Sequence, residues 1–191
     1  SALDILENLS PIRPGREALR ISQDRLTEKD FLTGLGLETA PYRAVDTRQD
    51  LAEAVDALGL PAILKTRRFG YDGKGQARLS TQDDQATAIA DMAGQAAVLE
   101  GFISFSKEIS IIGARNSAGD VACFDPGENI HQAGILRTTT VPAQINATQR
   151  MDAVLLAAQI MNALDYVGVM GVELFVTGQG LIVNEIAPRV H

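Results

Sequence analysis

The sequence predicts an α+β fold made of two lobes. Between about residues 43 and 99, two short apolar runs flank a glycine-rich loop and lie between two helical patterns, which predicts one compact lobe. Between residues 107 and 186, strand-like runs joined by glycine-containing turns accompany one longer helical pattern. We therefore expect three regions: an N-terminal arm and helix over 1–42, a small lobe over 43–103 and a large lobe over 104–191.

Capping signals predict the helices of the first half. Ser22 is expected to cap a helix that ends near Gly34, after an arm without periodicity over residues 1–20. Thr47 and Asp50 have the spacing of a capping box, which recurs further along the chain. The other expected elements of this half are a strand at 41–45, a helix over 51–58, strands at 61–64 and 76–79, and a helix opened by Thr81 and Asp84.

Hairpins dominate the second half. The expected strands are 97–103, 107–114, 121–124, 168–176 and 181–186. Residues 125–136 are polar and contain glycine, and we expect no strand there. A helix starting at Asn146 or Thr148 is expected to bury the face formed by Met151, Val154, Leu155, Ala158, Met161 and Leu164.

The composition excludes several classes of protein. The 191 residues are 46% hydrophobic and carry a net charge of −7, so a core forms but an open nucleic-acid or anionic-membrane surface is not expected. The single cysteine, Cys123, allows no internal disulfide and lies in an apolar run typical of a buried structural thiol. The sequence shows no signal peptide or membrane-spanning run, which favours a cytoplasmic protein. It opens on Ser1 and ends directly after a strand, so we expect a fragment of a longer protein.

The loop that follows the first lysine strand carries the strongest chemical signal. Three glycines between residues 70 and 75 allow backbone N–H groups to converge on an anion, and Lys65, Arg67, Arg68 and Lys74 surround them with positive charge. A polyphosphate is the expected guest, although a plain hairpin turn also fits. No Walker A helix follows the loop, and we expect the loop to be mobile without a ligand.

Two glutamates occupy the apolar strands at the end of the chain. A three-residue turn at 178–180 places Glu173 opposite Glu185, with Cβ atoms roughly 4.5–5.5 Å apart. Two carboxylates so close repel, so one should be harder to ionise, and their oxygen ligands favour magnesium between them. We expect this face to open toward Lys65 and the opposite face to pack on the helix. A solvated outer face, or a bulge that breaks the register, is the alternative.

Three further residues are weaker candidates. Glu100 ends a strand whose backbone could serve an adenine edge, and Glu108 is placed to accept from ribose hydroxyls. Each also fits a solvated strand end. His131 fits either a substrate contact or a loop histidine satisfied by its neighbours, and we favour the second interpretation.

The order of these features resembles the ATP-grasp superfamily. Within it, four motifs resemble the 5-(carboxyamino)imidazole ribonucleotide synthetase family more closely. They are residues 70–76 (Gly-Tyr-Asp-Gly-Lys-Gly-Gln), 128–132 (Glu-Asn-Ile-His-Gln), 134–137 (Gly-Ile-Leu-Arg) and 184–191 (Asn-Glu-Ile-Ala-Pro-Arg-Val-His). The resemblance runs from about Ala18 to His191.

The resemblance implies an ATP-dependent C–N ligase of purine biosynthesis, with a nucleotide cleft between two α+β lobes and ATP and Mg²⁺ as cofactors. Such enzymes carboxylate 5-aminoimidazole ribonucleotide with bicarbonate and give 5-(carboxyamino)imidazole ribonucleotide, ADP and phosphate. Bicarbonate attacks the γ-phosphoryl group, and carboxyphosphate, or the CO₂ it releases, carboxylates the amine. The family also has an N-terminal open α/β domain and a small C-terminal domain. We therefore expect this chain to be inactive alone, with a homodimer among the states open to the full-length protein.

The resemblance also assigns roles to individual residues. Those implied to bind ATP are Arg25, Lys65, Gly70, Asp72, Gly73, Gly75, Gln76, Glu100, Gly101, Phe102, Glu108 and Asn184. Those implied to bind magnesium are Glu173 and Glu185. Those implied to face the ribonucleotide and bicarbonate are Tyr71, Lys74, Arg189 and His191, whose cations suit anionic substrates.

Two departures and two rivals remain. Ala187 stands where many ATP-grasp enzymes have asparagine, in agreement with this subfamily, and the chain stops at His191 inside the family's substrate motif. One rival is another ATP-grasp carboxylate–amine ligase, which a different acceptor would stimulate. The other is a nucleotide-binding module without chemistry, which would not need the two terminal-hairpin glutamates.

Overall fold

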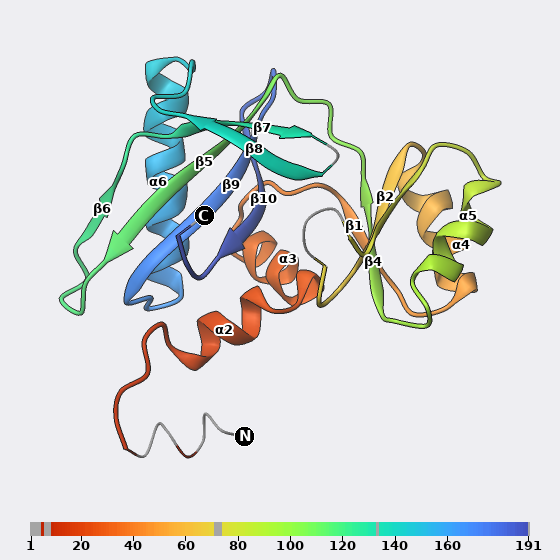
Figure 1. The fold of residues 1–191 in the computed structure, drawn as a ribbon, viewed down its shortest axis with the longest axis horizontal. Helices are drawn as coiled ribbons and strands as arrows, with labels where there is room; N and C mark the ends of the chain where they lie inside the picture. The colour runs from red at the N-terminus through yellow and green to blue at the C-terminus, as the bar shows by residue number, and fades with distance from the viewer. Residues whose placement is uncertain (1–4, 6–8, 71–73, 133, 191) are drawn as a thin grey trace.

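The computed structural model describes residue 5 and residues 9–70, 74–132 and 134–190. The helices are α2 (Arg16–Ser22), α3 (Arg25–Gly34), α4 (Arg48–Leu58), α5 (Asp84–Asp91) and α6 (Ala147–Ala163). The strands are β1 (Tyr42–Val45), β2 (Ala62–Thr66), β3 (Gln76–Leu79), β4 (Ala97–Gly101), β5 (Lys107–Arg115), β6 (Val121–Cys123), β7 (Gly127–Gln132), β8 (Ile135–Thr140), β9 (Gly168–Val176) and β10 (Leu181–Ala187). Figure 1 shows two sheets with α3 between them.

The smaller sheet has the strand order β1-β4-β2-β3, and all its pairings are antiparallel. Because side chains alternate along a strand, Leu64 and Leu99 lie on the face that α4 and α5 cover, within one buried apolar cluster. Lys65 and Glu100 lie on the opposite face, where Ile63 of β2 is the direct partner of Glu100. The sequence therefore buries one face of this sheet and leaves charge on the other.

The larger sheet has the order β10-β9-β5-β7-β8, and β6 pairs with β5. As expected, Val172 and Leu174 share one apolar cluster with residues of α6 such as Ile160. Ala18 of α2 and Leu32 of α3 belong to the same cluster. The two N-terminal helices are thus anchored on the larger sheet, and α3 turns its other side toward the smaller one (Figure 1).

Two expectations about secondary structure were wrong. Residues 16–22 form α2 rather than part of an arm, because Ala18 and Ile21 gain burial against the larger sheet. Residues 127–132 and 135–140 form the paired strands β7 and β8, although their composition is polar. β8 is an edge strand with mostly exposed side chains, and β7, between β5 and β8, buries Gly127 and Asn129 rather than apolar side chains, so neither shows the apolar alternation of a half-buried strand.

The buried face of α6 also differs from the prediction. Met161 and Leu164 are buried as expected, but Met151 and Leu155 are 59% and 58% exposed. Small residues, with Ala157 the central one, face the sheet instead. Small side chains let the helix backbone approach the sheet closely, an effect that hydrophobicity alone does not indicate.

Side-chain caps explain where α4 and α3 begin, whereas α5 has no such cap. Thr47 and Asp50 form the predicted capping box of α4. The cap of α3 is Asp24 rather than Ser22, since its carboxylate accepts the backbone N–H groups of residues 26 and 27. Asp84 accepts the backbone N–H groups of residues 80 and 81, but α5 begins at Asp84 itself and the full capping box does not form.

Two further expectations concern the burial of the cysteine and the presence of a membrane-spanning helix. Cys123 is half-buried at the edge of the larger apolar cluster, rather than fully buried. Within the described ranges, no helix combines the length and the apolar content needed to cross a bilayer.

Candidate functional site

The β9–β10 hairpin places Glu173 directly opposite Glu185, as the sequence predicts. The route to this register differs from the expected one. Leu181 pairs with Val176 instead of Thr177, and a bulge at Asn184 then shifts the register by one residue. The bulge therefore corrects the offset at the turn and restores the glutamate pair.

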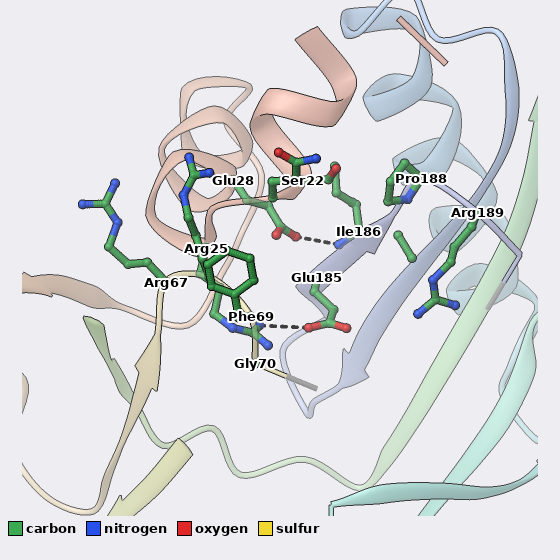
Figure 2. Close-up of a pocket in the computed structure, with 13 residues that line it drawn as sticks. Ser22, Arg25, Glu28, Arg67, Phe69, Gly70, Glu185, Ile186, Pro188 and Arg189 are labelled. Carbon is green, nitrogen blue, oxygen red and sulfur yellow. Dashed lines mark hydrogen bonds and ion pairs between the residues drawn. The ribbon is translucent and has the colours of Figure 1, made fainter. Parts of the chain in front are cut away.

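The two carboxylates have different environments. Asn184 Nδ2 donates to Glu173 Oε2 at 3.1 Å. The Glu173 side chain is buried, although from the sequence we expected it to be open to the cleft. Arg25 Nη1 of α3 donates to Glu185 Oε2 at 2.9 Å, across the gap between the helix and the hairpin (Figure 2). Both carboxylates thus have a partner that reduces their mutual repulsion.

A cavity of about 440 Å³ opens beside this ion pair. Figure 2 shows Arg25 and Glu28 of α3 directed toward β10 across it. Its lining residues are Ser22, Gln23, Arg25, Glu28, Arg67, Arg68, Phe69, Gly70, Glu185, Ile186, Ala187, Pro188 and Arg189. The structure therefore brings together four residues that the sequence assigned to a site: Arg25, Gly70, Glu185 and Arg189.

Glu28 is a buried acid that the sequence analysis missed. Its Oε1 accepts the backbone N–H of Ile186 at 2.6 Å, which ties α3 to β10 beside Glu185 (Figure 2). Burial, followed by the negative charge of Glu185, raises the pKa of Glu28 to about 8, although the Ile186 N–H opposes this shift. The carboxyl that is hard to ionise beside Glu185 is thus Glu28.

Lys65 lies on the cleft face of the smaller sheet, where its Nζ donates to Glu100 Oε2 at 2.9 Å. Lys29 Nζ, on α3, lies 3.4 Å from the same oxygen. Burial disfavours the charged form of Glu100, but Lys65 and Lys29 outweigh it and lower the pKa of this carboxyl. Arg25 contributes in the same direction, so it links the Glu185 and Glu100 ends of the cleft electrostatically.

From the sequence, we expected the arginines of the glycine loop to surround an open anion-binding concavity. In the structure they contact a carboxylate of the chain instead. Arg67 forms two hydrogen bonds with Asp24, at 2.9 and 2.8 Å, and Arg68 lies 3.3 Å from the same carboxylate. Burial of Asp24 opposes its ionisation, but the contacts with Arg67, the Thr27 N–H and Arg68 together outweigh it and hold the pKa of Asp24 below its ordinary value. The described start of the loop is therefore fastened to the cap of α3.

The base of the loop is narrow. Thr66 N–H donates to the carbonyl of Gly75 at 2.7 Å, and Gly75 has a φ of 69°. A Cβ at Gly75 would lie 2.5 Å from Thr66 Oγ1, so this position requires glycine. Tyr71, Asp72 and Gly73 lie outside the described residues, and the expected mobility of the loop stays a prediction.

Glu108, His131 and Glu173 form a second group, on three adjacent strands of the larger sheet. Each offers a ligand atom within 4.8 Å of the others, and His131 Nδ1 lies 3.2 Å from Glu108 Oε2. His131 is thus a strand residue beside two predicted site residues, and not the loop histidine we favoured. The strand β7 that positions it was the element missing from the prediction.

The remaining predicted residues are placed as follows. Phe102 is partly exposed under the guanidinium of Arg78, 4.6 Å from its ring centroid, and Gly101 N–H donates to the carbonyl of Pro41. Gln76 begins β3 and Lys74 is exposed just before it. Arg189 lines the cavity, whereas His191 lies outside the described residues.

The charged residues that sequence reasoning missed all belong to α3 and its cap. Asp24, Glu28 and Lys29 are almost fully buried, yet their spacing along the helix is that of an ordinary solvated face. Their partners lie far along the chain, in or next to β2, β4 and β10, so no local pattern could have identified them.

The comparison with known families agrees with this geometry. A model of the ATP-grasp domain matches residues 30–191. The chain belongs to the ATP-grasp family. Its two sheets, with a charged cleft between them, are the ATP-grasp fold.

Similar proteins have been named and solved. The chain is 50% identical over 194 residues to the N5-carboxyaminoimidazole ribonucleotide synthase of Brucella melitensis, covering 100% of this chain and 54% of that protein. It superposes with a TM-score of 0.91 and 42% identity on the N5-carboxyaminoimidazole ribonucleotide synthetase of Thermus thermophilus, covering 98% of this chain and 51% of the other.

A solved structure with lower sequence identity is a complex with ligands. It is an N5-carboxyaminoimidazole synthase of Aspergillus clavatus in complex with ADP and 5-aminoimidazole ribonucleotide, with a TM-score of 0.92 and 26% identity. The match covers 100% of this chain and 50% of that one. The ATP-grasp chain thus spans about half the length of the relatives it matches.

Proposed function

We propose that the natural protein containing this chain carboxylates 5-aminoimidazole ribonucleotide with bicarbonate at the expense of ATP. The products are 5-(carboxyamino)imidazole ribonucleotide, ADP and phosphate, in purine biosynthesis. The observation that supports this most strongly is the meeting of Arg25, Gly70, Glu185 and Arg189 at one cavity, in a chain similar along its whole length to named synthases. The substrates are small water-soluble anions, which suits a cytoplasmic enzyme, and a homodimer is one assembly open to it.

The proposed nucleotide site runs along the cleft from β4 to β10. Arg25 and Lys65 bind the phosphates, and the glycine loop, with Gly70, Asp72, Gly73, Gly75 and Gln76, closes over them. The strand end with Glu100, Gly101 and Phe102 lines the adenine site. Glu108 holds the ribose, and the adjacent position of His131 is consistent with a site that extends along the larger sheet. Asn184 lies within the same network through its hydrogen bond to Glu173.

The carboxylates of the hairpin fit a magnesium ion. Glu173, Glu185 and the amide oxygen of Asn184 offer an oxygen-only donor set, which is the kind that Mg²⁺ takes. When bound, the ion supplies positive charge to the phosphate oxygens of the nucleotide. The chain's own part is to hold these three side chains on a bulged hairpin whose back is packed in the core.

The chemical step requires charge neutralisation and alignment. A bicarbonate oxygen bonds to the γ-phosphorus as the bond to the ADP oxygen breaks. The amine then bonds to the carboxyl carbon as phosphate leaves, and the departing phosphate takes the proton that the amine loses. Lys74 and Arg189, with Tyr71 and His191, are proposed to hold the two anionic substrates in line with the γ-phosphoryl group. Arg25 keeps its positive charge, because burial lowers its pKa but Glu185, together with Glu28 and Glu100, raises it by more.

Phosphate release tests this function. The natural protein containing this chain should release phosphate from ATP with bicarbonate, and 5-aminoimidazole ribonucleotide should stimulate the rate. Stimulation by glycinamide ribonucleotide or biotin instead would indicate a different ATP-grasp ligase. Tight ATP binding without turnover under any of these conditions would indicate a binding module.

A further inference from the structure

The Glu100 carboxylate is shared by two lysines from different parts of the molecule. Lys65 reaches it from β2 at 2.9 Å and Lys29 from α3 at 3.4 Å, both at Oε2. One carboxylate thus faces two lysine amines in a nearly enclosed space. Burial lowers the pKa of Lys29, but the negative charge of Glu100 opposes this shift and favours the protonated amine. The site holds one lysine more than Glu100 alone requires.

The two lysines differ in freedom. The Lys29 side chain is only 3% exposed, whereas that of Lys65 is 12% exposed. Lys29 Nζ also lies 6.0 Å from the centroid of the Tyr42 ring, whose hydroxyl donates to Asp30 of the same helix at 2.7 Å. Lys29 is therefore fixed between α3 and the sheet, and Lys65 is the lysine able to turn into the cleft.

Two atoms of this cluster have unused hydrogen-bonding capacity. Among the described residues, neither Lys29 Nζ nor Glu100 Oε1 makes a hydrogen bond, although both atoms are enclosed. A buried carboxylate that lost its only counter-charge would be strongly disfavoured. If Lys65 turns away from Glu100, Lys29 remains beside this carboxylate, and its Nζ has an N–H group available to donate to it.

We propose that Lys29 is a positioning residue: it keeps Glu100 neutralised so that Lys65 can give its charge to the nucleotide phosphates. The inference rests on the proposed function for the identity of the ligand. It assigns Lys29 no contact with ATP. Without Lys29, Lys65 stays with Glu100 and is withheld from the phosphates.

Ligands with and without phosphate separate this role from a structural one. Adenosine and ATP binding to the natural protein containing this chain are measured by calorimetry, for the wild type, Lys29→Met, Lys65→Met and the double variant. Each single variant should bind ATP roughly tenfold more weakly, the size expected for one charged hydrogen bond, and adenosine about as well as the wild type. The double variant should bind ATP no more weakly than Lys65→Met, because both changes remove the same contact.

The controls make each outcome decisive. Lys107→Met removes a lysine paired with Glu128 at 2.7 Å elsewhere on the larger sheet and should leave both affinities unchanged. Additive losses in the double variant, or equal losses for adenosine and ATP, would overturn the role of Lys29. A wild type that binds no ATP would contradict the proposed function instead.

A second variant tests the proposal even if Lys29→Met alone folds poorly. Adding Glu100→Gln removes the charge that retains Lys65, so Lys29→Met/Glu100→Gln should recover the wild-type ratio of ATP to adenosine affinity. A ratio that stays at the level of Lys65→Met would contradict the proposal.

Discussion

Glu28 and Glu100 are two glutamates on opposite sides of the same cleft, with nearly equal burial and opposite electrostatics. They are 4% and 3% exposed. Burial and Glu185 raise the pKa of Glu28 to about 8, whereas Lys65 and Lys29 overcome burial and lower that of Glu100. Burial sets the cost of a charge, and the neighbours decide whether the charge is kept.

This difference gives the cleft two ends of opposite character. The β10 end gathers three carboxyl groups, those of Glu28, Glu173 and Glu185, beside Arg25. The β4 end has two lysines for one carboxylate. The proposed metal ligands lie at the first end, and Lys65, one of the two proposed phosphate ligands, lies at the second.

The largest expected effect comes from removing both cations at the β4 end. Lys29→Met with Lys65→Met leaves Glu100 buried without a close counter-charge and should cost about 3–5 kcal/mol of unfolding free energy at neutral pH. Denaturant unfolding measures it. Adding Glu100→Gln should recover most of the loss, and no recovery would show that the lysines stabilise through packing alone.

At the β10 end, Glu185→Gln should act mainly on chemistry. Removal of one proposed metal ligand should lower the rate of phosphate release roughly 10²-fold, a loss typical of a group that stabilises the transition state. It should also lower the pKa of Glu28, because a like charge disappears. An unchanged rate of phosphate release would contradict the proposed role of Glu185 as a metal ligand.

Glu28→Gln tests the sign of the pH dependence. A carboxyl whose folded pKa is raised from 4.5 to about 8 stabilises the fold fully below 4.5 and loses that contribution as the pH rises to about 8. Relative to Glu28→Gln, the wild type should therefore lose roughly 2 kcal/mol between pH 4.5 and 8, less than the full shift because Glu185 and Arg25 share it. Parallel stability profiles of the two proteins would contradict the raised pKa.

The smallest effect is expected at Asp24. Asparagine caps a helix as well as aspartate, so Asp24→Asn should remove only the ionic part of the contacts to Arg67 and Arg68, about 1 kcal/mol. The pKa of Asp24 is lowered, so this contribution is present at neutral pH and is lost as the pH falls through the folded-state pKa. Equal stability of the two proteins at pH 7 would show that the ion pairs of Asp24 with Arg67 and Arg68 are screened by solvent and contribute no stability.

Local patterns predicted much of the fold. Alternation and glycine turns located the hairpins, and the capping box located α4. The opposition of Glu173 and Glu185 was predicted with the wrong turn and is correct because the bulge at Asn184 compensates. Strands β7 and β8 were not predicted because β8 is an exposed edge strand and the buried positions of β7 are Gly127 and Asn129, so neither has apolar alternation.

The candidate site was predicted only where its residues lie in motifs. Gly70 belongs to one motif and Glu185 and Arg189 to another, and the fold brings the two motifs together at the cavity. Glu28 and Lys29 have no motif, because their charge is buried by strands distant in sequence. Whether a charged residue on a helix faces water or another lobe is decided by tertiary packing.

Titration of the two glutamates tests the central contrast most directly. Carbon-13 NMR of labelled glutamate carboxyl groups, assigned with Glu28→Gln and Glu100→Gln, follows each group from about pH 3 to about pH 9, so that a group with a pKa well below about 3 stays ionised throughout. Glu28 is expected to titrate near pH 8, and Glu100 below its ordinary value of 4.5. Two carboxyls that titrate together, or a Glu100 pKa above that of Glu28, would contradict it.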